Sequence, residues 1–146
     1  MAVLTLRAAA QKARGVAKQD ILAHLHSRSE LLRLAQEIKG LTGERARLVH
    51  LATHFRRAVH GDRSSEGLCF IVSWPLAAFL ERFGYKPTLE AGSVQGRAHC
   101  WLGVGLLVVD ATADQFTDPD GRPMPPVFVG ICPPWYSPDF DNSRCQ

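Results

Sequence analysis

The chain has 146 residues, 46% of them hydrophobic and 21% charged, and a formal net charge of +3 at pH 7. This composition is typical of a soluble globular protein rather than a disordered one, and the length favours a single domain spanning residues 1–146. The charge is too small to indicate a nucleic-acid partner, so we expect none.

The lack of a recognisable targeting signal and the cysteine pattern both favour a cytoplasmic protein. No apolar run reaches the ~18 residues of a transmembrane helix, and the N-terminal segment lacks the basic region and apolar run of a secretory signal. The four cysteines form no C-x-x-C pair and are too few for a dense disulfide framework. We therefore expect a reducing compartment, no membrane association and no cofactor, although leaderless export would leave no mark in the sequence.

Residues 1–60 form a predicted helical portion. Its three predicted helices are Met1–Lys18, Gln19–Lys39 and Glu44–His60. Ser27 or Ser29 divides the second of them, and Ser29 is the expected N-cap of the part that follows. Gly40 is the expected C-cap.

The third predicted helix has a basic face. Its arginines are Arg45, Arg47, Arg56 and Arg57. Such a face is usually solvated, but it also suits an acidic protein partner. His50 and His54 lie four residues apart on the same helix, as metal-binding pairs do, yet the H-E-x-x-H pattern is missing. A solvated helix face is the favoured interpretation of both.

Residues 61–131 form the second predicted portion, a helix followed by a small sheet. After the polar loop Gly61–Gly67, the spacing of apolar residues predicts a helix over Leu68–Phe83, with Pro75 kinking it or starting a second segment. The predicted strands are Pro87–Ala91, Ala98–Gly103, Leu106–Asp110 and Val127–Ile131. The connections between them are Gly92–Arg97 and the loop Thr117–Pro126.

Residues 132–146 are expected to be an irregular tail anchored by Trp135 and Tyr136. Cys132 and Cys145 lie in predicted loops, and no partner is evident for either. The order of elements predicts an α+β fold in which N-terminal helices and a helix headed by a cysteine pack on a small antiparallel sheet.

The two central strands are predicted to form a hairpin that brings His99 and Asp110 together. A two-residue turn at Val104-Gly105 places them directly opposite each other, with Cβ atoms roughly 5 Å apart on one face. If the turn shifts by one residue, the two become diagonal neighbours that are still in reach. A satisfied core histidine and a strand-end aspartate that caps the next turn remain the simpler alternatives.

Cys69 begins the predicted helix that precedes this hairpin. A helix N-terminus favours the thiolate, which is the reactive form, and the Cys69 backbone N–H could act as an oxyanion donor. The alternative is that Cys69 packs as a small hydrophobic residue. Cys100 alternates to the sheet face opposite His99, so we expect it to be inert core.

The chain resembles the papain-like thiol enzymes, specifically their transglutaminase-like branch, over about residues 61–116. The matching features are G-L-C-F-I-V-S-W at Gly67–Trp74, A-H-C-W-L at Ala98–Leu102 and V-V-D-A-T-A at Val108–Ala113. The resemblance implies a papain-like core in which Cys69 is the nucleophile, His99 the general base and acid, and Asp110 the orienting carboxylate.

One departure from this family concerns the oxyanion. Many of these enzymes carry a glutamine before the cysteine as an oxyanion donor, whereas the loop here offers only Arg63, Ser64 and Ser65. The second donor stays unassigned, with Trp74 and Gln115 as residues that could lie near the site.

The expected function is a thiol-dependent hydrolase or acyltransferase that acts on a protein or peptide amide, of protease, glutamine deamidase or transglutaminase type. The alternative is a non-catalytic protein-binding module that uses the basic helical face on the same scaffold. A third possibility is metal-dependent hydrolysis with Cys69, His99 and Asp110 as zinc ligands, although nothing else in the sequence supports a metal. The acyl acceptor and the oligomeric state are left open by the sequence.

Overall fold

The computed structural model describes residues 27–61 and 64–138, and within them the protein has an α+β fold. The helices are α2 (Arg28–Lys39), α3 (Glu44–Val59), α4 (Cys69–Glu81) and the short 3-10 helix η1 (Ala113–Gln115). The strands are β1 (Thr88–Val94), β2 (Arg97–Val104), β3 (Leu107–Asp110), β4 (Phe128–Gly130) and β5 (Tyr136–Pro138). The predicted helix Met1–Lys18 lies outside the described residues. None of the described helices is long and apolar enough to cross a membrane.

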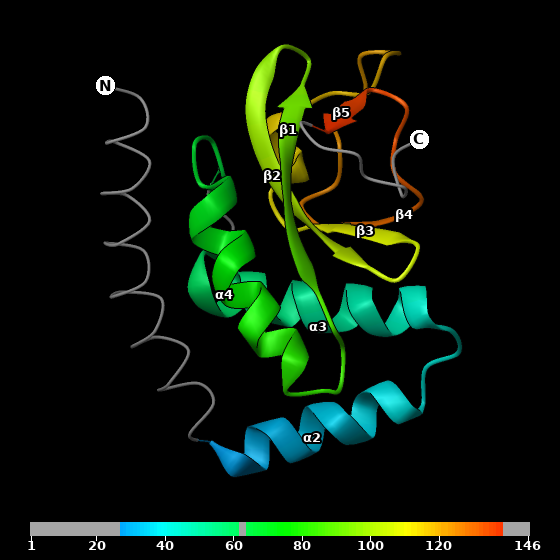
Figure 1. The fold of residues 1–146 in the computed structure, drawn as a ribbon. Coiled ribbons are helices and arrows are strands. Elements are labelled where there is room, and N and C mark those ends of the chain that lie inside the picture. The colour runs from blue at the N-terminus through cyan, green and yellow to red at the C-terminus, as the bar shows by residue number, and fades with distance from the viewer. Residues whose placement is uncertain (1–26, 62–63, 139–146) are drawn as a thin grey trace.

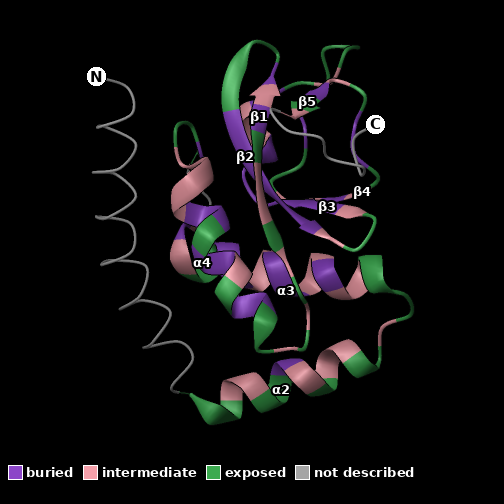
Figure 2. Ribbon diagram, in the orientation of Figure 1, coloured by how far each residue is buried: buried purple, intermediate pink, exposed green. Residues whose placement is uncertain are grey.

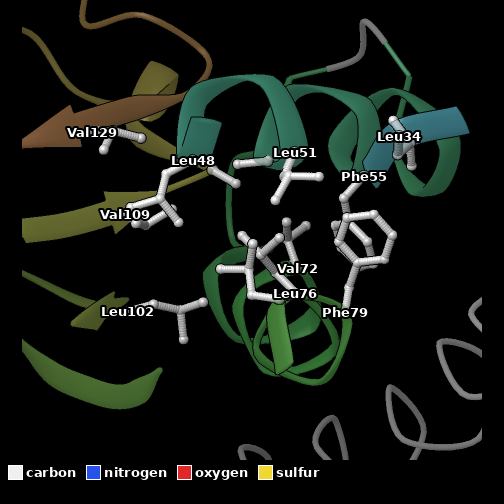
Figure 3. Packing of buried hydrophobic residues seen from close by; sticks show 13 residues of the cluster. Leu34, Leu48, Leu51, Phe55, Val72, Leu76, Phe79, Leu102, Val109 and Val129 are labelled. Carbon is white, nitrogen blue, oxygen red and sulfur yellow. The ribbon is translucent and has the colours of Figure 1, made fainter. Parts of the chain in front are cut away.

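The five strands form one antiparallel sheet in the order β4-β3-β2-β1-β5. Helices α3 and α4 cover one face of the sheet, and α2 packs on α3 (Figure 1). The main hydrophobic core joins this face to the helices through residues such as Leu51, Leu76 and Val109 (Figure 3). A second cluster, which includes Trp101, Phe116 and Tyr136, fills the opposite side. Both sides of the middle strands are therefore buried (Figure 2).

The predicted helices are confirmed where the structure describes them, with one correction at a cap. The Ser27 side chain accepts a hydrogen bond from the Glu30 backbone N–H at 3.3 Å, so Ser27 is the N-cap of α2. The prediction of Ser29 was wrong, because Ser29 lies inside the first turn. Gly40 is the C-cap as predicted, and α4 passes through Pro75 as one helix rather than two segments.

Strand β1 is longer than predicted, and the predicted connection Gly92–Arg97 was wrong. The turn between β1 and β2 contains only Gln95 and Gly96, with φ angles of 53° and 75°. Positive φ at both central residues is the type I′ geometry that matches the twist of a tight hairpin. Of the rest of the predicted connection, Gly92–Val94 extends β1 and Arg97 begins β2, and Gly92 pairs with both neighbouring strands.

The turn between β2 and β3 forms one residue later in the chain than predicted. Leu102 pairs with Val109 and Val104 with Leu107, so the turn is Gly105-Leu106 and not Val104-Gly105. The prediction that His99 lies directly opposite Asp110 was wrong, and the diagonal arrangement given as the alternative is the one that forms. Because the two registers differ by two positions in the opposing strand, both keep His99 and Asp110 on one face.

The C-terminal tail is not wholly irregular, which corrects that prediction. Tyr136–Pro138 forms β5, which pairs with β1 at the edge of the sheet. A Cβ atom on Gly92 would lie 2.1 Å from the Ser137 carbonyl oxygen, so the close approach of β5 requires glycine at this position. The pairing also holds the Tyr136 side chain in the interior.

Candidate active site

Cys69 is the first residue of α4, as the sequence predicts, and its side chain is partly exposed. No side chain caps the start of this helix, so the backbone N–H groups of its first turn are left for another acceptor. The preceding Gly67 has φ +72°, a conformation that glycine adopts without strain and that turns the loop sharply into the helix. The helix start therefore presents both a thiol and backbone donors.

His99 and Asp110 form a buried hydrogen-bonded pair. The distance between His99 Nε2 and Asp110 Oδ2 is 2.7 Å, and neither side chain has measurable exposure to solvent. Because a carboxylate only accepts hydrogen bonds, Nε2 carries the proton of this bond. The Phe116 ring packs against the imidazole in a T-shaped arrangement, with 4.7 Å between ring centroids, which limits the rotation of the imidazole. The contact predicted from the hairpin is thus present.

Asp110 is held by three further donors. The Tyr136 hydroxyl donates to Oδ2 at 2.6 Å, the same oxygen that accepts from His99. The backbone N–H and the hydroxyl of Thr112 donate to Oδ1 at 3.0 and 3.2 Å. Four donors therefore hold this buried carboxyl group in one position. The predicted alternative, an aspartate that caps the following turn, is therefore also realised, through the other oxygen.

The sulfur of Cys69 lies against β2, where it interacts with both His99 and Cys100. Strand β3 pairs with β2 only over Leu102–Val104. The edge of β2 at His99 and Cys100 is therefore not covered by β3. The second ring nitrogen of His99, Nδ1, is buried and has no hydrogen-bond partner within the described ranges. Since Nε2 is occupied by Asp110, Nδ1 is the nitrogen that faces the sulfur.

The two groups shift each other's protonation. Interaction with the Cys100 side chain, together with the adjacent, positively charged His99, outweighs burial and lowers the pKa of the Cys69 thiol to about 4. Burial acts to lower the pKa of His99, but the hydrogen bond with Asp110 and the neighbouring Cys69 outweigh it and raise this pKa to about 9. Between these two values the site holds a thiolate next to an imidazolium.

A buried ion pair supports the loop before Cys69. Arg56 from α3 contacts Asp114 from η1 at 3.0 Å and donates to the Ala111 carbonyl at 2.6 Å. The Ser65 hydroxyl, four residues before Cys69, donates to the same Asp114 carboxylate. This cluster joins the loop that enters α4 to the turn that follows Asp110, so it fixes the relative positions of the two.

The predicted basic face is not a continuous exposed surface, which corrects the sequence interpretation. Arg56 is only 4% exposed and is used as described above. Arg45 donates to the Val129 carbonyl, and Arg47 donates to the carbonyl groups at the end of α2 and the start of the following loop. His50 is hydrogen-bonded to Glu37 rather than paired with His54.

Three further observations concern residues singled out in the sequence. Within the described residues, no group of three or more His, Cys, Asp or Glu side chains is arranged to hold a metal ion. The Gln115 amide donates to the Thr112 carbonyl, and Trp74 stacks on Phe70 along an exposed side of α4. Cys132 is disulfide-bonded, which is uncommon in the reducing compartment that the sequence favoured.

Two residues of the site were missed by sequence reasoning. Tyr136 was expected only to anchor the tail, and Cys100 was expected to be inert because it faces away from His99. Cys100 is indeed buried on the opposite face, but that face is covered by α4, and this places it next to Cys69.

Comparisons of the chain with protein-family models, curated proteins and solved structures found no match.

Proposed function

We propose that the protein is a thiol-dependent hydrolase or acyltransferase of the Cys-His-Asp type that acts on a protein or peptide amide. The observation that carries the proposal is the arrangement around His99. One ring nitrogen is bound to the buried Asp110, and the other faces the sulfur at the start of a helix. Thiol acyl transfer needs these three groups in this order.

In the proposed reaction, the Cys69 thiolate attacks the substrate carbonyl carbon. Backbone N–H groups at the start of α4 donate hydrogen bonds to the developing oxyanion. His99 donates its Nδ1 proton to the leaving amine, which breaks the carbon–nitrogen bond and leaves a thioester on Cys69. His99 then removes a proton from the incoming nucleophile, which releases the acyl group and restores the thiolate. Water as the nucleophile gives hydrolysis, and an amine gives acyl transfer.

The low pKa of Cys69 and the raised pKa of His99 support this proposal. A cysteine acts as a nucleophile in its thiolate form, and these pKa values favour the thiolate at neutral pH. Asp110 contributes by holding the imidazole in one tautomer and stabilising its positive charge. The binding-module alternative has weaker support, since three of the four arginines of the basic face are engaged within the protein.

The test uses p-nitrophenyl acetate as a general acyl donor. Mixing excess ester with the protein at pH 6 should give a burst of p-nitrophenolate that approaches one equivalent, with an acetyl group on Cys69 by mass spectrometry. At this pH a thiol with an ordinary pKa of ~8.5 is less than about 1% ionised, so an ordinary cysteine gives no comparable burst. The Cys69→Ala variant should lose the burst.

Two histidine variants complete the test. His99→Gln should slow acetylation at pH 6 strongly, while His50→Gln, on the surface of α3, should leave the rate unchanged. If Cys69 is acetylated no faster than a free thiol, or at equal rates with and without His99, the proposal is wrong.

A further inference from the structure

The two free cysteines within the described residues are neighbours. Cys69 begins α4, and Cys100 lies on the face of β2 that α4 covers. Each side chain is the largest influence on the pKa of the other, so the two thiols lie close enough to interact. Cys100 also contacts Ser73, one helical turn after Cys69, so its sulfur lies along the side of α4 that faces the sheet. A reactive thiol therefore has a second thiol within contact distance.

The two thiols are chemically unequal. Cys69 is partly exposed and adjoins the His99 ring, which makes it accessible and ionised. Cys100 is 6% exposed, and its interaction with Cys69 together with burial raises the pKa of its thiol. An oxidant from solvent therefore reaches and attacks Cys69 first. This combination, an exposed thiolate with a protected thiol beside it, is typical of reversible cysteine oxidation sites.

We propose that Cys69 and Cys100 form a reversible disulfide when hydroperoxide oxidises the site, with Cys100 as the resolving thiol. This modification would switch off the activity proposed above, and it rests on the same Cys69 thiolate. It would also protect the sulfur from further oxidation, since sulfinic and sulfonic acids are in general not reduced back to the thiol. Cys100 would then act as the resolving thiol in addition to filling space in the core.

The chemistry has two balanced steps. The Cys69 thiolate attacks one oxygen of the hydroperoxide, the oxygen–oxygen bond breaks, and the His99 imidazolium protonates the leaving oxygen; for hydrogen peroxide the products are a sulfenic acid and water. The Cys100 sulfur then attacks the sulfenic sulfur, and its proton leaves with the displaced hydroxide as a second water. Two electrons pass from the pair of thiols to the peroxide, and a dithiol reductant returns them.

The experiment treats the reduced full-length protein with hydrogen peroxide, blocks the remaining thiols and digests it without reduction. Trypsin together with an Asp-specific endoprotease releases Cys69, Cys100 and Cys132 in separate peptides, because cleavage sites lie between them at Arg97 and Asp110. We expect a Cys69–Cys100 linked peptide, with a mass equal to both peptides less two hydrogen atoms. The acetylation burst should fall with the growth of this peptide and return after dithiothreitol.

The Cys100→Ala and Cys100→Ser variants provide the matched comparison. In both, peroxide should convert Cys69 to sulfinic and sulfonic acids, and dithiothreitol should not restore the burst. The proposal is overturned if wild-type Cys69 is over-oxidised while Cys100 keeps its thiol, if Cys69 links to Cys132 or to a second chain, or if Cys69 resists peroxide. The wild-type measurement decides this even if the variants fold poorly. Failure here leaves the acetylation burst of the reduced protein intact, so the two proposals fail separately.

Discussion

Replacing Asp110 by asparagine tests the site most sharply, because it keeps the shape of the side chain and removes its charge. The Thr112 backbone N–H requires an acceptor at the Oδ1 position, so the asparagine carbonyl stays there. The amide nitrogen then occupies the position of Oδ2 and faces His99 and Tyr136. A donor at this position can bond the imidazole only if Nε2 has lost its proton. We therefore expect the variant to hold the wrong histidine tautomer, with the proton on Nδ1 facing the sulfur.

The size of the effect follows from the pKa of His99. At about 9, roughly 30 imidazolium ions exist for every neutral ring at pH 7.5. Without the carboxylate this pKa falls, because burial still lowers it and only the neighbouring Cys69 still raises it, so a smaller fraction of the rings is charged at pH 7.5. The variant loses both the positive charge of His99 and the tautomer protonated at Nε2. The corresponding aspartate-to-asparagine change in a serine triad lowers the rate by about 10⁴-fold. We expect a loss of about 10³- to 10⁴-fold in Cys69 acetylation.

Two assays check this prediction. The first is the rate of the p-nitrophenyl acetate burst at pH 7.5, and the second is the NMR titration of the His99 ring, assigned with the His99→Gln variant. Asp118→Asn, in an exposed loop where the side chain accepts only backbone N–H bonds, is the control and should match wild type. A His99 pKa that stays above about 8 in the Asp110 variant, or a burst within about threefold of wild type, would refute the reasoning.

Three further predictions concern the elements that hold the site. Arg56→Ala leaves the partly buried Asp114 carboxylate without its charged partner and should lower the free energy of unfolding by about 3 kcal/mol in urea, whereas Arg57→Ala next to it should cost within about 0.5 kcal/mol; equal losses would contradict the Arg56–Asp114 ion pair. Tyr136→Phe removes one hydrogen bond to a charged group and should cost about 1.5–3 kcal/mol in the same assay, so an unchanged stability would mean that the hydroxyl bond does not form. Gly92→Ala forces a methyl group onto the Ser137 carbonyl and should abolish the slow hydrogen exchange of the β5 amides; retained protection would show that β5 adjusts.

The sequence was sufficient to predict the pairing of His99 with Asp110 because alternation along a strand is a local property. The turn was placed one residue too early, since Leu106 is hydrophobic and was counted as the first residue of a strand. In the structure its side chain is 76% exposed at the turn. The error did not separate the pair, because both registers keep the same faces of the hairpin.

Arg56 and Tyr136 show what local patterns do not contain. Helical spacing puts Arg56 beside other arginines, and only the approach of Asp114, 58 residues later, makes it a buried group. Tyr136 follows two prolines and precedes a third, which is the signature of a loop, yet an edge strand tolerates such residues because half of its backbone groups need no partner. Long-range pairing decides both cases, and no single-sequence pattern encodes it.

Cys100 illustrates a different kind of error, because the prediction of its direction was correct and the conclusion was not. Alternation sends Cys100 away from His99, which predicts that it lies outside the site. That step assumes that Cys69 reaches the sheet from the histidine side. Cys69 instead arrives on a helix that covers the other face and meets β2 at an edge that β3 leaves unpaired, so its sulfur contacts a residue of each face. A site at the edge of a strand takes side chains from both faces of the sheet. Cys100, the chain neighbour of His99, therefore belongs to the site as much as Asp110, the hydrogen-bond partner of His99.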